Sequence, residues 1–193
     1  KELCVEAGRP DSVDRDMLSM LLDMGVQRIS INPQTMNQKT LEAIGRGHSP
    51  EDIVRAFEQA RSLGFGDINM DIILGLPGED RQDFARTLER IRQMSPDGLT
   101  VHALAVKRAS RLREQLRADQ ESVAMVQEKE AEAMQAMAAE AAAQMKMTPY
   151  YMYRQKYSAG NLENVGYAAP GKACIYNIDI MEETTAILAM GAG

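Results

Sequence analysis

Short apolar runs alternate with amphipathic stretches along the first two thirds of the chain. Strand-like runs cover residues 4–7, 26–32, 68–74 and 99–105. Between them, apolar side chains recur every three or four residues, which is the spacing of a helix with one buried face. Four strands connected by helical crossovers predict right-handed βαβ units and a parallel sheet, either an arc of a TIM-type barrel or an open doubly wound sheet. The run at 68–74 is nearly all apolar, which is typical of a parallel strand covered on both faces.

Capping residues and glycines mark the helix boundaries. Ser49, Pro50 and Asp52 have the order of a capping box with proline in the first turn, and Asp80 precedes the next helical stretch. Helices are expected to end at the glycines that follow three of the periodic segments, namely Gly25, Gly45 and Gly64.

The last third of the chain has a different composition. Residues 121–147 are rich in alanine, methionine, glutamate and glutamine, which predicts one long helix whose methionines serve packing. A tyrosine-rich segment at 150–153 follows, then a glycine-punctuated loop over 160–171 and a last apolar strand over 175–180. The sequence therefore predicts a parallel α/β part followed by a helical extension.

Length and charge narrow the class of protein. A chain of 193 residues with 45% hydrophobic content can bury the core of one domain. Its net charge of -6 provides no basic field for nucleic acid or an anionic membrane, and no apolar run approaches the ~20 residues of a membrane-spanning helix. The first residues lack the order of a signal peptide, so we expect a cytoplasmic protein. The chain opens inside a strand-like run and stops in an apolar one, and we expect it to be cut at both ends.

Two cysteines, Cys4 and Cys174, are the only ones in the chain. They lie far apart in sequence and belong to no CxxC or Cys/His pattern, so the sequence predicts neither a disulfide framework nor a zinc site. Both are expected to be buried small apolar residues. No metal ligand is predicted within this chain.

Polar residues at the ends of the predicted strands are candidates for a site, because parallel strands open their carboxyl ends onto one face. The candidates from the strands and their loops are Glu6, Ser30, Asn32, Gln34, Asp71, the GLPG turn at 75–78, His102, Lys107 and Arg108. Glu6 and Asp71 interrupt apolar runs, where an unpaired carboxylate is costly, so each either binds a ligand or forms a structural ion pair or capping contact inside the sheet. Taken singly, Gln34 and Arg46 are typical surface residues, and His102 is typical of a satisfied core histidine.

Five sequence motifs, in order, resemble the oxygen-independent coproporphyrinogen III oxidases of the radical S-adenosylmethionine (SAM) superfamily. They are VEAGRP at 5–10, GVQRISINPQTM at 25–36, IGRGH at 44–48, INMDIILGLPGE at 68–79 and LTVHALAVKRAS at 99–110. Their order is that of strands three to six of the family. Three later motifs resemble the subgroup called coproporphyrinogen dehydrogenase, namely YRQK at 153–156, GNLENVGYAAPGK at 160–172 and AMGAG at 189–193. Heme chaperones share much of this pattern.

The resemblance implies a partial radical SAM barrel over residues 1–108, with a helical and mixed extension of the same domain over 109–193. In that family a 4Fe-4S cluster cleaves SAM, the resulting 5'-deoxyadenosyl radical abstracts hydrogen from a propionate chain, and loss of carbon dioxide leaves a vinyl group. The family converts coproporphyrinogen III to protoporphyrinogen IX and needs an electron donor. By position, Glu6 matches a family residue that contacts SAM. Gln34, Arg46 and Asp71 match contacts to SAM or to a second copy of it, and Ala105 matches a backbone contact. No residue is assigned a catalytic role.

One departure from the family is large. The CxxxCxxC motif that carries the cluster is absent, and two cysteines cannot supply the usual set of about four ligands. The cluster ligands are therefore expected upstream of residue 1, and this chain alone is expected to be inactive. Because the substrate is tetra-anionic, basic residues are predicted to line the mouth of the pocket: Arg108, Arg111, Arg154 or Lys156. Arg113 is also basic, although scattered basic residues commonly just solvate a surface.

Two other functions stay open from the sequence. A heme-binding chaperone on the same scaffold would hold or transfer heme instead of oxidising a porphyrinogen. If the resemblance is set aside, the chain is an ordinary α/β domain with a helical interaction arm over 121–147.

Overall fold

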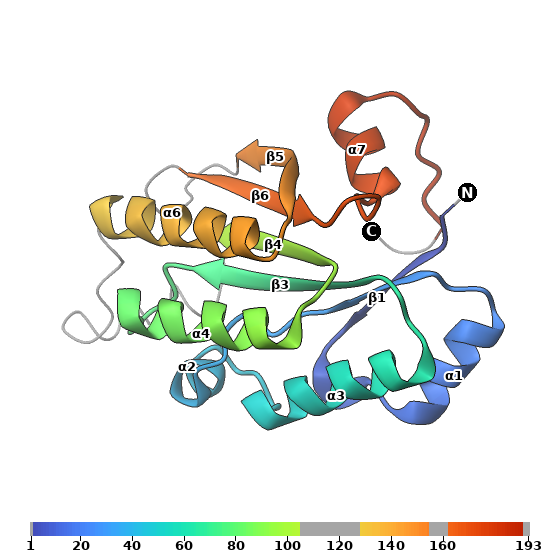
Figure 1. The fold of residues 1–193 in the computed structure, drawn as a ribbon, viewed down its shortest axis with the longest axis horizontal. Helices are drawn as coiled ribbons and strands as arrows, with labels where there is room; N and C mark the ends of the chain where they lie inside the picture. The colour runs from blue at the N-terminus through green and yellow to red at the C-terminus, as the bar shows by residue number, and fades with distance from the viewer. Residues whose placement is uncertain (1, 105–127, 155–161, 191–193) are drawn as a thin grey trace.

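The computed structural model describes residues 2–104, 128–154 and 162–190. Within these residues the chain forms one six-stranded sheet with strand order β1-β2-β3-β4-β6-β5 (Figure 1). Neighbouring strands are parallel from β1 to β4, while β6 runs antiparallel to both β4 and β5. The strands are β1 (Cys4–Gly8), β2 (Arg28–Ile31), β3 (Ile68–Leu74), β4 (Gly98–Ala103), β5 (Thr148–Arg154) and β6 (Glu163–Ala168). The four predicted parallel strands are confirmed.

The helices pack mainly around one side of this sheet. Figure 1 shows α1, α3 and α4 along one side, with α6 lying beside α4. The helical elements are η1 (Pro10–Ser12), α1 (Arg15–Asp23), α2 (Gln38–Ala43), α3 (Pro50–Leu63), α4 (Arg81–Met94), α6 (Glu128–Gln144) and α7 (Ile175–Glu182). None of the described helices is both long enough and apolar enough to cross a membrane.

The alternation of side chains in β3 explains how the sheet separates a core from a site. Its four even-numbered residues are fully buried in the hydrophobic core: Ile68, Met70, Ile72 and Leu74. Asn69 and Asp71 have the opposite orientation, because successive strand residues face opposite sides. No residue of β3 is exposed, as predicted for a strand covered on both faces, although the second face carries polar groups that line a cavity.

Helix boundaries follow the predicted capping chemistry. At α3 the Ser49 side chain accepts a hydrogen bond from the Asp52 N–H, and the Asp52 carboxylate accepts one from the Ser49 N–H, which completes the capping box. Gly64 ends this helix with φ of +104°, a conformation that favours glycine. Asp80 caps α4 through the N–H groups of Gln82 and Asp83.

In the last third of the chain two predicted segments are wrong and one is confirmed in part. The segment predicted as a strand over 175–180 is helix α7, and the segment predicted as a loop over 160–171 contains strand β6. The tyrosines at 150–153 lie on β5. The predicted long helix is confirmed as α6, although residues 121–127 lie outside the described part. No observation tests the predicted boundary between 1–108 and 109–193.

Candidate functional site

A cavity of about 550 Å³ lies against the polar face of β1 to β4. Tyr151 of β5 and the residues around α7 complete its wall. Its polar lining from the sheet consists of Glu6, Arg28, Ser30, Asn69, Asp71, Thr100, His102 and Tyr151. These residues alternate with core residues along their strands, so the period of two in the sequence is the signal that identifies them.

Glu6 of β1 accepts hydrogen bonds from a residue of β2 and from the residue that follows this strand. The Ser30 hydroxyl donates to Oε1 of Glu6 at 3.1 Å, and the Asn32 amide donates to Oε2 at 3.3 Å. The Glu6 side chain is exposed to the cavity, so the premise that it is buried is wrong. Its oxygens therefore keep lone pairs available to a ligand.

Asp71 stands two strands away in the same cavity. The Asn69 amide donates to Oδ1 of Asp71 at 2.7 Å, and Nε2 of His102 lies 3.6 Å from Oδ2. His102 is partly exposed and lines the cavity, so its interpretation as a core histidine is wrong. Glu6 and Asp71 thus present two carboxylates to one space from β1 and β3.

Tyr151 forms a wall of the cavity above β6. Burial raises the pKa of its phenol, and the nearby charge of Asp71 adds to the increase, so the phenol stays protonated and can donate a hydrogen bond. Its ring stacks on Tyr153 with centroids 6.3 Å apart, and it meets Tyr150 edge-on at 4.8 Å. The ring occupies space that a side chain at Gly166 would need, which explains glycine at that position of β6.

Gln34 is fixed beside the end of β3 through its backbone. Its N–H donates to the carbonyl of Asp71 at 3.0 Å, and its carbonyl accepts from the N–H of Ile73 at 2.9 Å. Gln34 has φ of +67°, which is unusual for a residue with a side chain. Next to it, the Thr35 hydroxyl donates to the buried Glu79 at 2.5 Å, so this turn is clamped to the loop after β3.

Arg46 belongs to a separate polar cluster with Arg9, Asp11 and His48. Burial lowers the pKa of the Arg46 guanidinium, and repulsion from Arg9 lowers it further. Burial also lowers the pKa of His48, whose Nδ1 lies 3.8 Å from Asp11 Oδ1. Of the four predicted SAM contacts, the structure thus brings Glu6 and Asp71 into one cavity, ties Gln34 to the backbone of Asp71, and places Arg46 outside the cavity lining.

The other predicted contacts are on the edge of the described part or beyond it. Ala105, Arg108, Arg111 and Lys156 lie outside the described residues, as do Lys107 and Arg113. Arg154 ends β5, is exposed, and forms an ion pair with Glu163. All of these roles in binding stay predictions.

The two cysteines meet in space, which their sequence separation does not indicate. Cys174 is buried as predicted, whereas Cys4 is exposed, so that half of the prediction is wrong. The potential ligand atoms of Glu2, Cys4 and Cys174 all lie within 4.8 Å of one another. This group also lines the cavity.

Comparison with known protein families identifies the scaffold. The model of the Radical SAM superfamily matches residues 2–91. This part of the chain is similar to a radical SAM domain. A relative in Bacillus subtilis, the oxygen-independent coproporphyrinogen-III oxidase-like protein HemZ, is 42% identical over 193 residues, which is 100% of this chain and 38% of that protein. The heme chaperone HemW of the same organism is 34% identical over 106 residues, which is 55% of this chain and 28% of that protein.

A solved structure agrees with this radical SAM scaffold. Coproporphyrinogen III oxidase (HemN) from Escherichia coli, described as a radical SAM enzyme, matches with a TM-score of 0.67 over 94% of this chain and 38% of that one. At 22% sequence identity the match shows the fold alone, and it confirms the prediction of a partial radical SAM barrel. The chain spans well under half the length of all three relatives.

The superfamily implies SAM and a 4Fe-4S cluster, and the residues fit these two groups differently. The cavity offers two carboxylates with free lone pairs and a neutral phenol, which are partners for the ammonium and hydroxyl groups of SAM. A cluster needs about four ligands, mostly thiolates. Two cysteines cannot provide them, so the cluster does not fit this chain.

Proposed function

We infer that the chain is part of a radical SAM oxidoreductase that oxidatively decarboxylates coproporphyrinogen III to protoporphyrinogen IX. The observation that carries this inference is the alignment with the oxidase-like protein HemZ, which extends over all 193 residues and includes the extension after β4. The alignment with the heme chaperone HemW covers only 55% of the chain. An oxidoreductase of this type acts with an electron donor.

The residues of the cavity have defined tasks in this proposal. Bound SAM supplies a carbon-centred radical once it is reductively cleaved. Glu6, oriented by Ser30 and Asn32, accepts hydrogen bonds from ribose hydroxyls or from the ammonium group of SAM. Asp71, oriented by Asn69, does the same from β3, two strands away. The turn at Gln34 fixes the end of β3, and with it the position of Asp71.

SAM binding tests the roles of the two carboxylates. In the whole protein with its cluster reconstituted, Glu6→Gln and Asp71→Asn are each expected to weaken SAM affinity about 10-fold or more, because a hydrogen bond to a charged group contributes about 1.5–3 kcal/mol. Glu58→Gln on the exposed face of α3 is the matched control and should bind SAM normally. Normal SAM affinity in both cavity variants would refute the assignment and favour an ordinary α/β domain.

Product analysis tests the reaction. Under anaerobic conditions with a chemical reductant, SAM and coproporphyrinogen III, the whole protein is expected to release carbon dioxide and form a vinyl porphyrinogen together with 5'-deoxyadenosine. Failure to form the vinyl product, while SAM is still cleaved, would refute the proposed substrate.

A heme chaperone is the second candidate, because HemW is 34% identical to this chain over 106 residues. Under this alternative the whole protein binds heme stably and passes it to an acceptor protein without forming a vinyl product. Heme capture without turnover of coproporphyrinogen III would favour it over the oxidoreductase.

A further inference from the structure

Glu2, Cys4 and Cys174 come together at the amino-terminal end of the parallel strands. Cys4 begins β1, whereas Cys174 is the residue that precedes α7. The Ile175 N–H at the start of α7 donates to Oε2 of Glu2 at 2.8 Å, which leaves Oε1 of Glu2 free of that bond. Three side chains with metal-binding atoms thus converge from two segments that are remote in sequence.

We propose that Glu2, Cys4 and Cys174 bind a thiophilic divalent cation of the zinc class, with the fourth coordination position open to the cavity. Tetrahedral zinc with Zn–S bonds of about 2.3 Å holds neighbouring ligand atoms roughly 3.8 Å apart. The three ligand atoms lie within 4.8 Å of one another, so each pair is at most about 1 Å farther apart than this separation. Two thiolates and a carboxylate favour zinc over magnesium or calcium, which prefer sets made only of oxygen ligands.

The charges around the three side chains suit a bound cation. Coordination replaces the two thiol protons by the metal and releases them to solvent. The resulting complex carries one net negative charge, and the buried Arg28 guanidinium lies close enough to interact with both cysteines.

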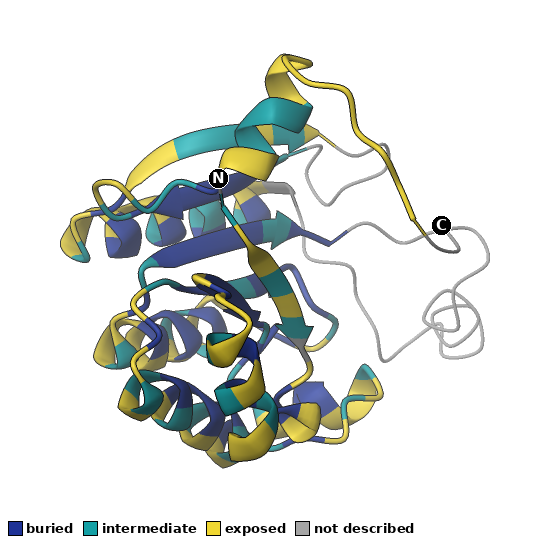
Figure 2. Ribbon diagram, turned by 90° about the vertical axis from the view of Figure 1, so that its right-hand side faces the viewer, coloured by how far each residue is buried: buried dark blue, intermediate teal, exposed yellow. Residues whose placement is uncertain are grey.

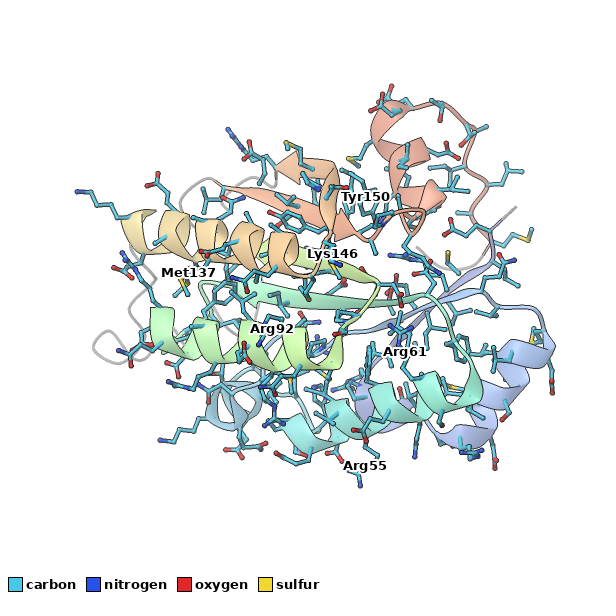
Figure 3. All side chains as sticks on the ribbon, viewed as in Figure 1. Arg55, Arg61, Arg92, Met137, Lys146 and Tyr150 are labelled. Carbon is cyan, nitrogen blue, oxygen red and sulfur yellow. The ribbon has the colours of Figure 1, made fainter. Side chains whose placement is uncertain are left out.

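The position of the group indicates a structural role for the cation. Helix α7 has no buried residue, and Figure 2 colours it as intermediate or exposed along its length. Tyr150, labelled in Figure 3 below α7, accepts a hydrogen bond from the Asn177 amide at 3.1 Å. With so little apolar contact to hold the helix, a metal bridge from Cys174 to Cys4 would fasten α7 to β1 and close this end of the cavity.

Cobalt is a sensitive probe of this site, because it occupies zinc sites and gives a thiolate-to-metal charge-transfer band. The 193-residue chain contains only two cysteines, so any such band must come from Cys4, Cys174 or both. Titration of the reduced chain with Co²⁺ under anaerobic conditions is expected to give one cobalt per chain, a thiolate band that Zn²⁺ abolishes, and release of about two protons per metal at neutral pH.

Three substitutions and one control locate the ligands. Cys4→Ser and Cys174→Ser are each expected to abolish the full-intensity band, and Glu2→Gln to weaken affinity about 10-fold or more, since a carboxylate is a much better ligand than an amide. Asp179→Asn, which changes another acidic residue of the cavity wall, should leave the titration unchanged. Circular dichroism confirms that each variant is folded.

A measurement on the unmodified chain guards against misfolded variants. Equimolar Zn²⁺ is expected to protect both thiols from alkylation by iodoacetamide at least 10-fold, and Mg²⁺ to give no protection. Four outcomes would each overturn the proposal. In the cobalt titration they are absence of the thiolate band, or a full-intensity band that persists in Cys4→Ser. The other two are equal alkylation with and without Zn²⁺, and formation of a Cys4–Cys174 disulfide by a chain whose reduced form binds no Co²⁺.

Discussion

Replacing Gly166 by alanine is expected to displace the Tyr151 ring from the wall of the cavity. Gly166 of β6 is paired with Tyr151 of β5, and the ring lies across the glycine. An added Cβ would stand 1.9 Å from Cε1 of Tyr151, 2.3 Å from Cδ1 and 2.8 Å from Cζ. These contacts involve the rigid ring and not the far end of a flexible side chain, so either the ring or the β5–β6 pair must move.

The size of the effect follows from the cost of overpacking. Inserting a methyl group into a well-packed site typically costs about 1–3 kcal/mol. For a protein of 150–250 residues, each kcal/mol lowers the Tm by about 2–4 °C, so Gly166→Ala is expected to melt roughly 2–12 °C below the unmodified chain. Gly66→Ala is the matched control, because the nearest atom to its added Cβ is Nζ of Lys172 at 4.0 Å.

A double-mutant cycle isolates the contact between Tyr151 and Gly166. Thermal unfolding is measured for Gly166→Ala, for Tyr151→Ala and for the double variant. Because Tyr151→Ala removes the atoms that clash, the alanine at 166 should cost far less in that background, which gives a coupling energy above about 1 kcal/mol. Equal costs of Gly166→Ala in both backgrounds, or a Tm indistinguishable from that of Gly66→Ala, would refute the packing argument.

Three further changes test the capping box, a buried carboxyl and a buried ion pair. Ser49→Ala removes the side-chain cap of α3 and should cost about 0.5–2 kcal/mol in urea unfolding, whereas Ser62→Ala, on the exposed side of the same helix, should change stability by less than about 0.5 kcal/mol. Burial raises the pKa of Glu79 above its ordinary 4.5, so its proton binds more tightly in the folded chain than in the unfolded one. The protonated Glu79 carboxyl therefore stabilises the folded chain below pH 4.5, and this stabilisation is lost as pH rises through the raised pKa. The Tm of Glu79→Gln relative to that of the unmodified chain should increase with pH. A difference in Tm that stays constant with pH would contradict this. Asp67→Ala removes the carboxylate that lies 2.8 Å from the Arg28 guanidinium, which is only 4% exposed. The loss should lower the free energy of unfolding in urea by about 3 kcal/mol. A loss below about 1 kcal/mol would show that the carbonyl of Lys172 suffices as the partner of Arg28.

Local chemistry made much of the fold predictable. The boundaries of β3 and the start of α3 follow from an apolar run and from a capping box, both of which act within a few residues. The local pattern could not predict that α7 is a helix, because Ile175, Ile178 and Ile180 suit a strand as well as a helix. No buried face decides between the two, since none of its residues is buried.

The site was predictable only where a residue stands out within its own strand. Glu6 and Asp71 interrupt apolar runs, so their placement in one cavity follows from parallel strand topology. Tyr151 enters from β5, whose place beside β6 depends on antiparallel pairing that no local pattern specifies. The meeting of Cys4 and Cys174 likewise depends on where the chain returns after β6, which only the assembled sheet determines.

The hydrogen bond between Glu2 and the N–H of Ile175 also bears on the order of folding. It joins residues 173 positions apart, so closing this loop restricts almost the whole described chain and contributes nothing until the intervening sheet has formed. During synthesis β1 leaves the ribosome long before α7 exists. The wall of the cavity that α7 provides is therefore completed last, and until then the polar face of the nascent sheet is open to solvent and to other chains.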